Sequence, residues 1–492
     1  MKNLTDFPDA HLRIFDRPPV PEAIDDVYLI GICGTGMGSL AGLFQQAGYC
    51  VRGSDAAVYP PMSTRLAEMS ILVLEGFDPA HLDPPPDLVI VGNACIPMHV
   101  EAAYAREQRL VQQSFPEALG HFFLRDRRSL VVAGTHGKTT TTGMLVHVLR
   151  EAGLDPGFLV GGVMTNGNVS YNAGSGPHFV VEGDEYDSAY FDKRPKFMHY
   201  RPTSAIVTSM EFDHADIYDD WDDYRDAFHA FARLVPSDGL LALWGDDANV
   251  RALAHHTTAR AHCYGLTNDA HITANNVEPV AGGQRFRLVT DGEDRGEIVL
   301  PMSGRHNLLN ALAVCTIALD EGLTPEQIAQ GFATFKGMKR RQEVRGEAGG
   351  VLVVDDFAHH PTAVHETIRA VGERWPGRRL VAVFEPRSNS SRRKVFETPY
   401  AEAFDGAGLV FLSAPPFRHN DEVERFMNTE VVVQTITERG PPAFVYPDAD
   451  VLLPPLLAQI QPGDVVLIMS NGSFGGLHDR LLEHLVKRDF SR

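Results

Sequence analysis

Cysteine is scarce in this 492-residue chain. The chain has five cysteines, which are Cys33, Cys50, Cys95, Cys263 and Cys315. Their number is odd, they are scattered along the chain, and no two of them form a C-x-x-C pair. This pattern indicates neither a zinc site nor a disulfide framework. A reducing compartment fits it best, and we expect a cytoplasmic protein.

Long apolar runs and an excess of positive charge are also missing. No apolar run approaches the roughly 18 residues of a membrane-spanning helix, and the N-terminus lacks the apolar stretch of about 7 residues that a signal peptide needs. Lysine and arginine number 44 against 64 aspartates and glutamates, which gives a formal net charge of −20. We therefore expect neither a membrane nor a nucleic acid as partner, and anionic substrates must meet local basic groups.

The length, by contrast, exceeds what one hydrophobic core organises and predicts two to three domains. Short apolar runs recur, most of them separated by helix-length stretches, which is typical of parallel sheets covered on both faces. These runs are 27–33, 88–91, 130–133, 179–181, 205–207, 351–354, 380–384, 409–412 and 465–469.

We therefore expect an α/β chain of three domains after an N-terminal arm, residues 1–26. A Rossmann-like domain is expected over 27–126, a central P-loop domain over 127–337 and a second Rossmann-like domain over 338–492. The central domain should have a mainly parallel sheet with a small antiparallel patch, because Asp291-Gly292 separates two strand-like stretches as a hairpin turn does.

A phosphate-binding loop follows the apolar run 130–133. Its sequence is Gly-Thr-His-Gly-Lys-Thr-Thr over residues 134–140, and a helical pattern comes next. Glycines let backbone N–H groups approach phosphate oxygens, Lys138 adds a point charge, and Thr139 offers a hydroxyl to Mg²⁺. The loop predicts a nucleoside triphosphate as substrate. Two residues separate Gly134 from the Gly-Lys pair, whereas the usual P-loop has four residues there. The shorter gap restricts the choice among families of P-loop proteins.

Two acidic segments follow later strands of the same domain. Glu182 lies in Glu-Gly-Asp-Glu after the run 179–181, and His214 lies in Glu-Phe-Asp-His after the run 205–207. Open α/β sheets gather their sites at such strand ends, and Mg²⁺ prefers oxygen donors. We interpret Glu182 and Thr139 as metal ligands and His214 as part of a second metal site. For the other acids, solvated loops are the better interpretation.

The N-terminal domain opens with a glycine-rich turn after its first strand. Gly36-x-Gly38-x-x-Ala41 fits the Rossmann fingerprint, and Asp55 lies about where the ribose-binding acid belongs. Taken alone, this suggests NAD. A glycine turn at a helix start, however, binds any pyrophosphate, including that of a UDP-sugar. A turn needed only for packing is the third interpretation.

Polar segments also follow other strands. His306, Asn307 and Asn310 begin a helix, where the amides serve either as caps or as contacts to adenine. In the C-terminal domain, the basic run 339–341 precedes three strand ends with polar residues, 355–362, 385–390 and 470–476. These predict a pocket, in which one of His359 and His360 is expected only to cap or pack a helix.

Together these segments resemble the Mur ligase family of peptidoglycan enzymes, from Val27 to the C-terminus. The resemblance implies two Mg²⁺ ions and catalytic roles for Lys138, Glu182, His214 and Arg341. The implied ATP site comprises Gly134, Thr135, His136, Gly137, Lys138, Thr139, Thr140, His306, Asn307, Asn310, Arg341, Asp355 and Asp356. The implied UDP-sugar site comprises Gly34, Thr35, Gly36, Met37, Gly38, Asp55 and Asn93. The implied peptide site comprises His359, His360, Arg387, Ser388, Asn389, Ser470 and Asn471, and the implied metal ligands are Thr139, Glu182 and His214.

Within the family, the chain resembles the members that act on UDP-N-acetylmuramate. The segments that begin at Tyr59, Phe357, Glu385 and Met469 are more similar to ligases that add the tripeptide L-alanyl-γ-D-glutamyl-meso-diaminopimelate, in peptidoglycan recycling, than to those that add L-alanine. The resemblance implies that ATP phosphorylates the muramoyl carboxylate and that the peptide amine attacks the acyl phosphate. It also implies closure of the C-terminal domain about a hinge at 337–341.

Three alternatives stay open. Within the family, the alternative is addition of L-alanine. In other classes, the glycine turn alone would suit a nicotinamide-dependent oxidoreductase, and the phosphate loop alone would suit a regulatory switch. The sequence predicts no oligomeric state.

Overall fold

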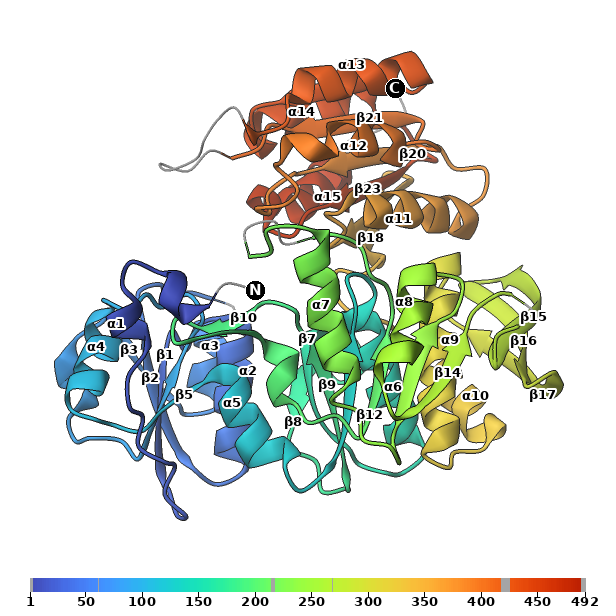
Figure 1. Cartoon of the computed structure of the whole chain (residues 1–492). Coiled ribbons are helices and arrows are strands. Elements are labelled where there is room, and N and C mark those ends of the chain that lie inside the picture. The colour runs from blue at the N-terminus through green and yellow to red at the C-terminus, as the bar shows by residue number, and fades with distance from the viewer. Residues whose placement is uncertain (1–2, 61, 214–216, 268, 417–424, 488–492) are drawn as a thin grey trace.

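The computed structural model describes residues 3–60, 62–213, 217–267, 269–416 and 425–487. It contains three α/β domains, each with its own main sheet (Figure 1). The N-terminal and central domains share a core, and the C-terminal domain, orange to red in Figure 1, lies above them. The predicted fold class is confirmed.

The N-terminal domain has a five-stranded, all-parallel sheet in the order β3-β2-β1-β4-β5. Its strands are β1 (Asp26–Ile30), β2 (Cys50–Asp55), β3 (Leu72–Glu75), β4 (Leu88–Val91) and β5 (Gln112–Ser114). Its helices are α2 (Thr35–Gln46), α3 (Met62–Glu68), α4 (Val100–Glu107) and α5 (Phe115–Leu119). The glycine turn therefore joins the end of the central strand β1 to the start of α2.

The central domain has a ten-stranded sheet in the order β17-β16-β15-β14-β13-β12-β6-β9-β7-β8. Its strands are β6 (Arg128–Ala133), β7 (Gly157–Met164), β8 (Val169–Asn172), β9 (His178–Gly183), β12 (Ser204–Val207), β13 (Leu240–Trp244), β14 (Arg260–Tyr264), β15 (Ile272–Val280), β16 (Gly283–Thr290) and β17 (Glu293–Leu300). Its helices are α6 (Lys138–Glu151), α7 (Trp221–Ala232), α8 (Ala248–Ala252), α9 (Arg305–Asp320) and α10 (Pro325–Ala333). The predicted hairpin is β16–β17, and β15 extends this antiparallel patch to three strands. A separate hairpin consists of β10 (Asp187–Ala189) and β11 (Asp192–Pro195).

The C-terminal domain has a six-stranded sheet in the order β18-β19-β23-β20-β21-β22, in which β18 is antiparallel to β19 and the other pairs are parallel. Its strands are β18 (Glu343–Ala348), β19 (Val351–Asp356), β20 (Leu380–Phe384), β21 (Leu409–Ser413), β22 (Ala443–Tyr446) and β23 (Val465–Met469). Its helices are α11 (Pro361–Arg374), α12 (Glu397–Ala403), α13 (Thr429–Arg439), α14 (Ala449–Gln459) and α15 (Leu477–Lys487).

Strand register in the central sheet determines which loops meet. β6 lies between β12 and β9, and all three are parallel. Ala133, the last residue of β6, pairs with Val207 on one side and with Gly183 on the other. Because these carboxyl ends lie at one edge, the phosphate loop after β6 is flanked by the segments after β9 and β12.

The buried apolar side chains show which domains are firmly joined. One continuous cluster includes Leu29 and Phe44 of the N-terminal domain together with Val131 and Phe228 of the central domain. Two clusters on the two faces of the third sheet belong to the C-terminal domain alone. The first two domains thus share a hydrophobic core, and the C-terminal domain is attached mainly through polar contacts and the linker.

The N-terminal arm packs across the junction of the first two domains. It contains a short helix, α1 (Ala10–Arg13). Phe15 of the arm contacts the rings of Tyr190 and Phe191 in the turn between β10 and β11, with centroids 6.3 and 5.8 Å away. Arg17 donates two hydrogen bonds, 2.8 and 3.0 Å long, to the carboxylate of Glu117 at α5. The arm therefore fastens both domains from outside their cores.

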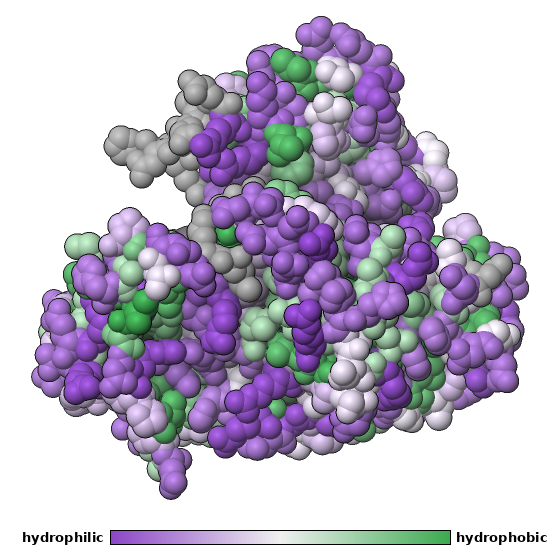
Figure 2. Space-filling model, viewed as in Figure 1, coloured by the Kyte–Doolittle hydropathy of each residue, from purple (hydrophilic) through white to green (hydrophobic). Residues whose placement is uncertain are grey.

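Figure 2 shows a mostly hydrophilic face, with apolar residues in small separate groups. Among the helices that the structure describes, none combines the length and apolar composition that a bilayer crossing requires.

Candidate active site

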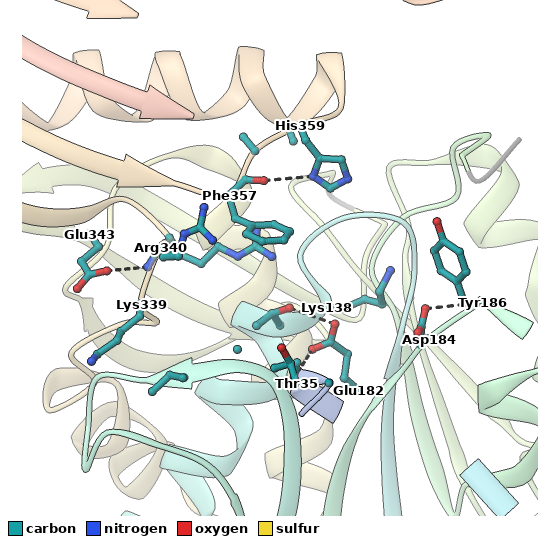
Figure 3. Close-up of a pocket in the computed structure, with 18 of the residues that line it drawn as sticks. Thr35, Lys138, Glu182, Asp184, Tyr186, Lys339, Arg340, Glu343, Phe357 and His359 are labelled. Carbon is teal, nitrogen blue, oxygen red and sulfur yellow. Dashed lines mark hydrogen bonds between the residues drawn. The ribbon is translucent and has the colours of Figure 1, made fainter. Parts of the chain in front are cut away.

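A cavity of about 1090 Å³ lies where the three domains meet. In Figure 3, Lys138 and Glu182 of the central domain lie on one side, and Arg340, Phe357 and His359 of the C-terminal domain lie on the other. The cavity brings together many of the residues that the sequence singles out. These are Gly34, Thr35, Asp55, Thr135, His136, Gly137, Lys138, Thr139, Glu182, Arg341, His359 and His360.

Two glycines of the phosphate loop have no room for a side chain. Gly134 and Gly137 have φ angles of 131° and 81°, in the region that favours glycine. A Cβ atom at Gly134 would lie 2.1 Å from Oγ1 of Thr208, and one at Gly137 would lie 2.6 Å from Oδ1 of Asn310. The loop is therefore held against the segment after β12 on one side and against α9 on the other.

Lys138 forms a buried ion pair at the start of α6. Its Nζ atom lies 2.8 Å from Oε2 and 3.0 Å from Oε1 of Glu185, whose side chain is fully buried. Burial alone would lower the pKa of Lys138, but the nearby carboxylates of Glu185, Asp184 and Glu182 outweigh it and raise this pKa. The ammonium group therefore stays charged at neutral pH, as phosphate binding requires.

Glu182 is the acid best suited to hold a cation. Its carboxylate accepts hydrogen bonds from Oγ1 of Thr139 at 3.1 Å and from the backbone N–H of Gly161 at 2.9 Å. Burial raises the pKa of Glu182 despite the nearby charge of Lys138. The nearby positive charge therefore does not offset the burial of this carboxylate, and together with the Thr139 hydroxyl it offers the hard oxygen donors that Mg²⁺ prefers.

The linker to the C-terminal domain forms one wall of the cavity. Gly337, Arg340 and Gln342 have φ angles of 86°, 58° and 50°, so its path is irregular. Arg340 donates to the backbone carbonyls of Ser470 and Gly472 at 2.6 and 2.7 Å. The guanidinium of Arg341 lies over the ring of Phe357, 5.0 Å from its centroid, and faces the cavity.

The N-terminal glycine turn reaches the cavity through Gly34 and Thr35. Asp55 lies beside it, and its two carboxylate oxygens accept hydrogen bonds from the N–H groups of Cys33 at 2.9 Å and Ala57 at 3.0 Å. Asp55 therefore shapes this wall as well as facing it. Of the other residues assigned to this subsite, Gly36, Met37, Gly38 and Asn93 are not among the lining residues.

The segment of His306, Asn307 and Asn310, which could contact adenine, lies behind the phosphate loop, and none of the three residues lines this cavity. The Asn307 amide donates to the carbonyl of Ser303 at 2.8 Å, which is a local contact at the start of α9. Nε2 of His306 lies 3.1 Å from Nε2 of Gln342 in the linker. Asn310 approaches Gly137, so this segment contacts both the phosphate loop and the linker.

Several other residues singled out in the sequence lie outside the lining set: Gly134, Thr140, Asp355, Asp356, Arg387, Ser388, Asn389, Ser470 and Asn471. Asp356 accepts from the N–H groups of Gln342 at 2.8 Å and Ala358 at 2.7 Å, so its carboxylate holds the linker. Asp355 pairs with His478, 3.1 Å away. The expected second-metal residue, His214, lies outside the described residues.

The two segments expected to bind the peptide, which follow β20 and β23, meet at the adjacent ends of these strands. Oγ of Ser470 donates to Oε2 of Glu385 at 2.5 Å, and Nη1 of Arg387 lies 3.6 Å from Oε1 of the same carboxylate. Asn389 accepts from Nη2 of Arg392 at 3.2 Å. Glu385 is thus the common partner of two residues that the sequence places in the peptide site. His360 occupies the N-cap position of α11 without a side-chain capping bond.

Sequence reasoning assigned no site role to several other residues of the wall. Tyr59, Met62 and Arg65 of the N-terminal domain and Tyr186 of the central domain line the cavity. Tyr59 and Met62 lie in a segment that was used only for the resemblance within the family. Arg65 and Lys339 add positive charge to a site in an acidic protein. Arg65 lies in the short helix α3, and nothing in the sequence around it indicates a binding role, whereas the basic run 339–341 was a usable signal.

Family models match most of the chain. The Mur ligase family catalytic domain matches residues 26–127, the Mur ligase middle domain residues 132–318, and the Mur ligase glutamate ligase domain residues 340–472. The chain belongs to the Mur ligase family. It is therefore an enzyme, an ATP-dependent ligase that forms amide bonds. The arm before Asp26 lies outside these matches.

Two curated relatives and one solved structure place this Mur ligase further. It is 41% identical over 467 residues to the UDP-N-acetylmuramate–L-alanyl-γ-D-glutamyl-meso-2,6-diaminoheptandioate ligase of Escherichia coli K12, which covers 94% of this chain and 98% of that protein. It is 34% identical over 459 residues to the UDP-N-acetylmuramate–L-alanine ligase of Chlorobaculum parvum, with 92% and 95% covered. The crystal structure of a murein peptide ligase from Psychrobacter arcticus matches with a TM-score of 0.71 and 34% identity, over 95% of this chain and 100% of that one.

Proposed function

We propose that this enzyme joins the tripeptide L-alanyl-γ-D-glutamyl-meso-diaminopimelate to UDP-N-acetylmuramate at the expense of ATP, in peptidoglycan recycling. The observation that carries this proposal is the 41% identity over nearly the whole chain to a ligase named for that reaction, against 34% to a ligase named for L-alanine. The loop of Arg387, Ser388 and Asn389 beside Glu385 is consistent with it, because a tripeptide is larger than alanine and presents more polar groups that need donors and acceptors.

ATP is held, in this proposal, with its phosphates at Gly134 to Thr140. Lys138 and the backbone N–H groups at the start of α6 neutralise the terminal phosphates. Asn310 and His306 lie behind the loop and contact the base, and Arg341 faces the cavity where charge develops in phosphoryl transfer. Asp355 and Asp356 also hold the linker, since Asp355 lies 3.6 Å from Nε of Arg340 and Asp356 accepts from the N–H of Gln342.

Mg²⁺ fits at Glu182 and Thr139, where it would neutralise phosphate charge. The support is chemical: a half-buried carboxylate with a raised pKa lies beside a hydroxyl at the phosphate loop. We propose a second ion near His214, because the sequence around this histidine also contains Glu211, Asp213 and Asp216.

The UDP-sugar is held, in this proposal, by the N-terminal domain, with its diphosphate at the turn from Gly34 to Gly38 and the start of α2. Asp55 and Asn93 are assigned to the same subsite. The muramoyl carboxylate then extends into the cavity toward the terminal phosphate of ATP. Phosphoryl transfer produces an acyl phosphate, and the peptide's α-amine attacks it with release of phosphate.

Domain closure completes the site in this account. ATP, the UDP-sugar and the peptide are held by three domains, with proposed boundaries at 27–126, 127–337 and 338–492. The acyl phosphate is sensitive to water, so the C-terminal domain must cover it before the amine attacks. The irregular linker from Gly337 to Arg341 is the proposed hinge, and His359 and His360 arrive with the closing domain.

The test is product formation by the purified enzyme. UDP-N-acetylmuramate and ATP are supplied with the tripeptide or with L-alanine, and the products are separated by chromatography and identified by mass spectrometry. We expect the UDP-muramoyl-tripeptide and ADP to form together. Formation of the alanine adduct alone would replace the proposal with its alternative, UDP-N-acetylmuramate–L-alanine ligase. The family assignment leaves the oxidoreductase and the regulatory switch without support.

A further inference from the structure

The carboxylate of Glu211 lies between the phosphate loop and the C-terminal domain. Its Oε2 atom accepts a hydrogen bond from Oγ1 of Thr362 at 2.7 Å. The same oxygen lies 3.1 Å from Nε2 of His136 and 3.6 Å from Nδ1 of His360. His136 belongs to the phosphate loop, whereas His360 and Thr362 stand at the start of α11. One oxygen atom therefore connects two domains.

The backbone of Glu211 is hydrogen-bonded to the phosphate loop. Its N–H donates to Oγ1 of Thr135 at 2.9 Å, and that hydroxyl lies 3.1 Å from the carbonyl oxygen of Glu211. Close by, Oγ of Ser209 accepts from the N–H of His136 at 2.8 Å. The loop and the segment 209–211 thus form one unit. A rotation of the C-terminal domain would leave this unit intact and change the contacts that the side chains of Glu211 and His136 make with α11.

The charges at this junction agree with such a role. Burial would raise the pKa of Glu211, but the hydrogen bond from His136 and the neighbouring groups lower it to about 2, so the carboxylate is ionised at neutral pH. The imidazole rings of His136 and His360 lie with centroids 4.7 Å apart. His360 is 8% exposed, and its Nδ1 atom has no hydrogen-bond partner among the described residues. The Glu211 carboxylate therefore faces both domains with a charge.

We propose that Glu211 is a positioning residue that couples the phosphate loop to the placement of α11. Through this coupling, the C-terminal domain places the amine for attack when the ATP site is occupied. The proposal rests on the proposed function in one respect, that the C-terminal domain delivers the amine. Hydrogen bonds to charged groups are among the stronger ones in proteins. Loss of the Thr362 bond should therefore reduce use of the amine about tenfold.

The variant Thr362→Val tests this with little disturbance, because Thr362 is exposed and valine has nearly its shape. Thr362→Ser is the matched control, since it keeps the hydroxyl. The measurements are kcat/KM for the amine at saturating ATP and UDP-sugar, and Kd for ADP with the free enzyme. We expect Thr362→Val to lose about tenfold in kcat/KM for the amine with Kd for ADP changed less than about twofold. Thr362→Ser should behave as the unchanged enzyme.

A double-mutant cycle with Glu211→Met, which removes the acceptor, separates coupling from general damage. If the two side chains act through each other, the double variant loses no more than Glu211→Met alone, whereas independent effects add. Additive losses, a Thr362→Val enzyme with normal kcat/KM, or equal losses in the amine and ADP measurements would each overturn the proposal. The assay uses whichever amine the unchanged enzyme turns over. A preference for L-alanine would therefore overturn the proposed substrate and leave this test intact.

Discussion

The Nζ atom of Lys138 lies 2.8 Å from Oε2 of Glu185, and the Glu185 side chain is fully buried. The phosphate-loop lysine thus serves the fold as well as the substrate. Removing one partner of a buried ion pair leaves the other charge unsatisfied, which costs about 3–5 kcal/mol. Substitution of Lys138 alone would therefore reduce both catalysis and stability, and the two effects could not be separated.

Substitution at both positions separates the two effects. We expect Lys138→Met to abolish ADP formation and to reduce the free energy of unfolding by about 3 kcal/mol. The double variant Lys138→Met/Glu185→Gln should recover most of the stability, because no buried charge remains unpaired, yet stay inactive. Chemical denaturation and an ADP-release assay on both proteins check this. An active double variant would remove Lys138 from the phosphate site.

Gly137 should not tolerate a side chain. Its φ of 81° disfavours alanine, and the added Cβ would lie 2.6 Å from Oδ1 of Asn310. We expect Gly137→Ala to weaken ADP binding at least tenfold, with a loss of stability of about 1 kcal/mol. Gly153, which also has a φ of 81° but open space around it, is the matched control. Titration calorimetry with ADP should show near-normal affinity for Gly153→Ala. Equal affinities in the two variants would contradict the account of the loop.

Stability should fall as the pH drops below about 6.5. Burial, followed by nearby positive charge, lowers the pKa of His306 to about 4, and burial lowers the pKa values of His359 and His360 to about 4 and about 3. The unfolded chain binds these protons first, so stability is complete above pH 6.5 and is lost on the way down toward pH 4. Glu211 acts in the same sense but at lower pH, because its pKa is also lowered by folding, and its contribution is lost as the pH falls from about 4.5 toward 2.

Thermal unfolding at pH 7.5, 6.5 and 5.5 checks this prediction. We expect a progressive fall in Tm below pH 6.5, and a shallower fall for His359→Gln, which has one proton fewer to take up. A Tm that is independent of pH in this range would show that these histidines are not held neutral by the fold.

The N-terminal arm offers two ion pairs for comparison. Arg17 pairs with the partly buried Glu117, whereas the pair between Arg109 and Asp16 is largely exposed, with 73% and 84% of the two side chains accessible. We expect Arg17→Met to cost about 2 kcal/mol and Arg109→Met less than about 0.5 kcal/mol. Urea denaturation measures both. Equal costs would mean that the arm does not fasten the N-terminal domain.

Much of the fold was accessible from the sequence, because both faces of these sheets are buried. Apolar runs then end where burial ends, and the runs 88–91, 380–384 and 465–469 coincide with β4, β20 and β23. The antiparallel patch was located by its turn at Asp291-Gly292, but β15 was missed. That strand is buried only at its start and then carries exposed residues such as Asn275 and Asn276, so it has no continuous apolar run.

The site was less accessible, because its contacts depend on how domains are placed. Glu211 was noticed only as one acid among several, and the bond that distinguishes it comes from Thr362, 151 residues later. Lys138 and Glu185 meet because β6 and β9 are neighbours in the sheet, a pairing that no local pattern reveals. Arg387 and Ser470 likewise meet through the pairing of β20 with β23.

The measurement closest to the central claim is a competition assay. The purified enzyme receives UDP-N-acetylmuramate, ATP and equal concentrations of tripeptide and L-alanine, and the two products are quantified over time. Our account predicts that the tripeptide product dominates in proportion to its higher kcat/KM and that ADP formation requires the UDP-sugar. Dominance of the alanine product, or ADP formation that ignores the UDP-sugar, would contradict it.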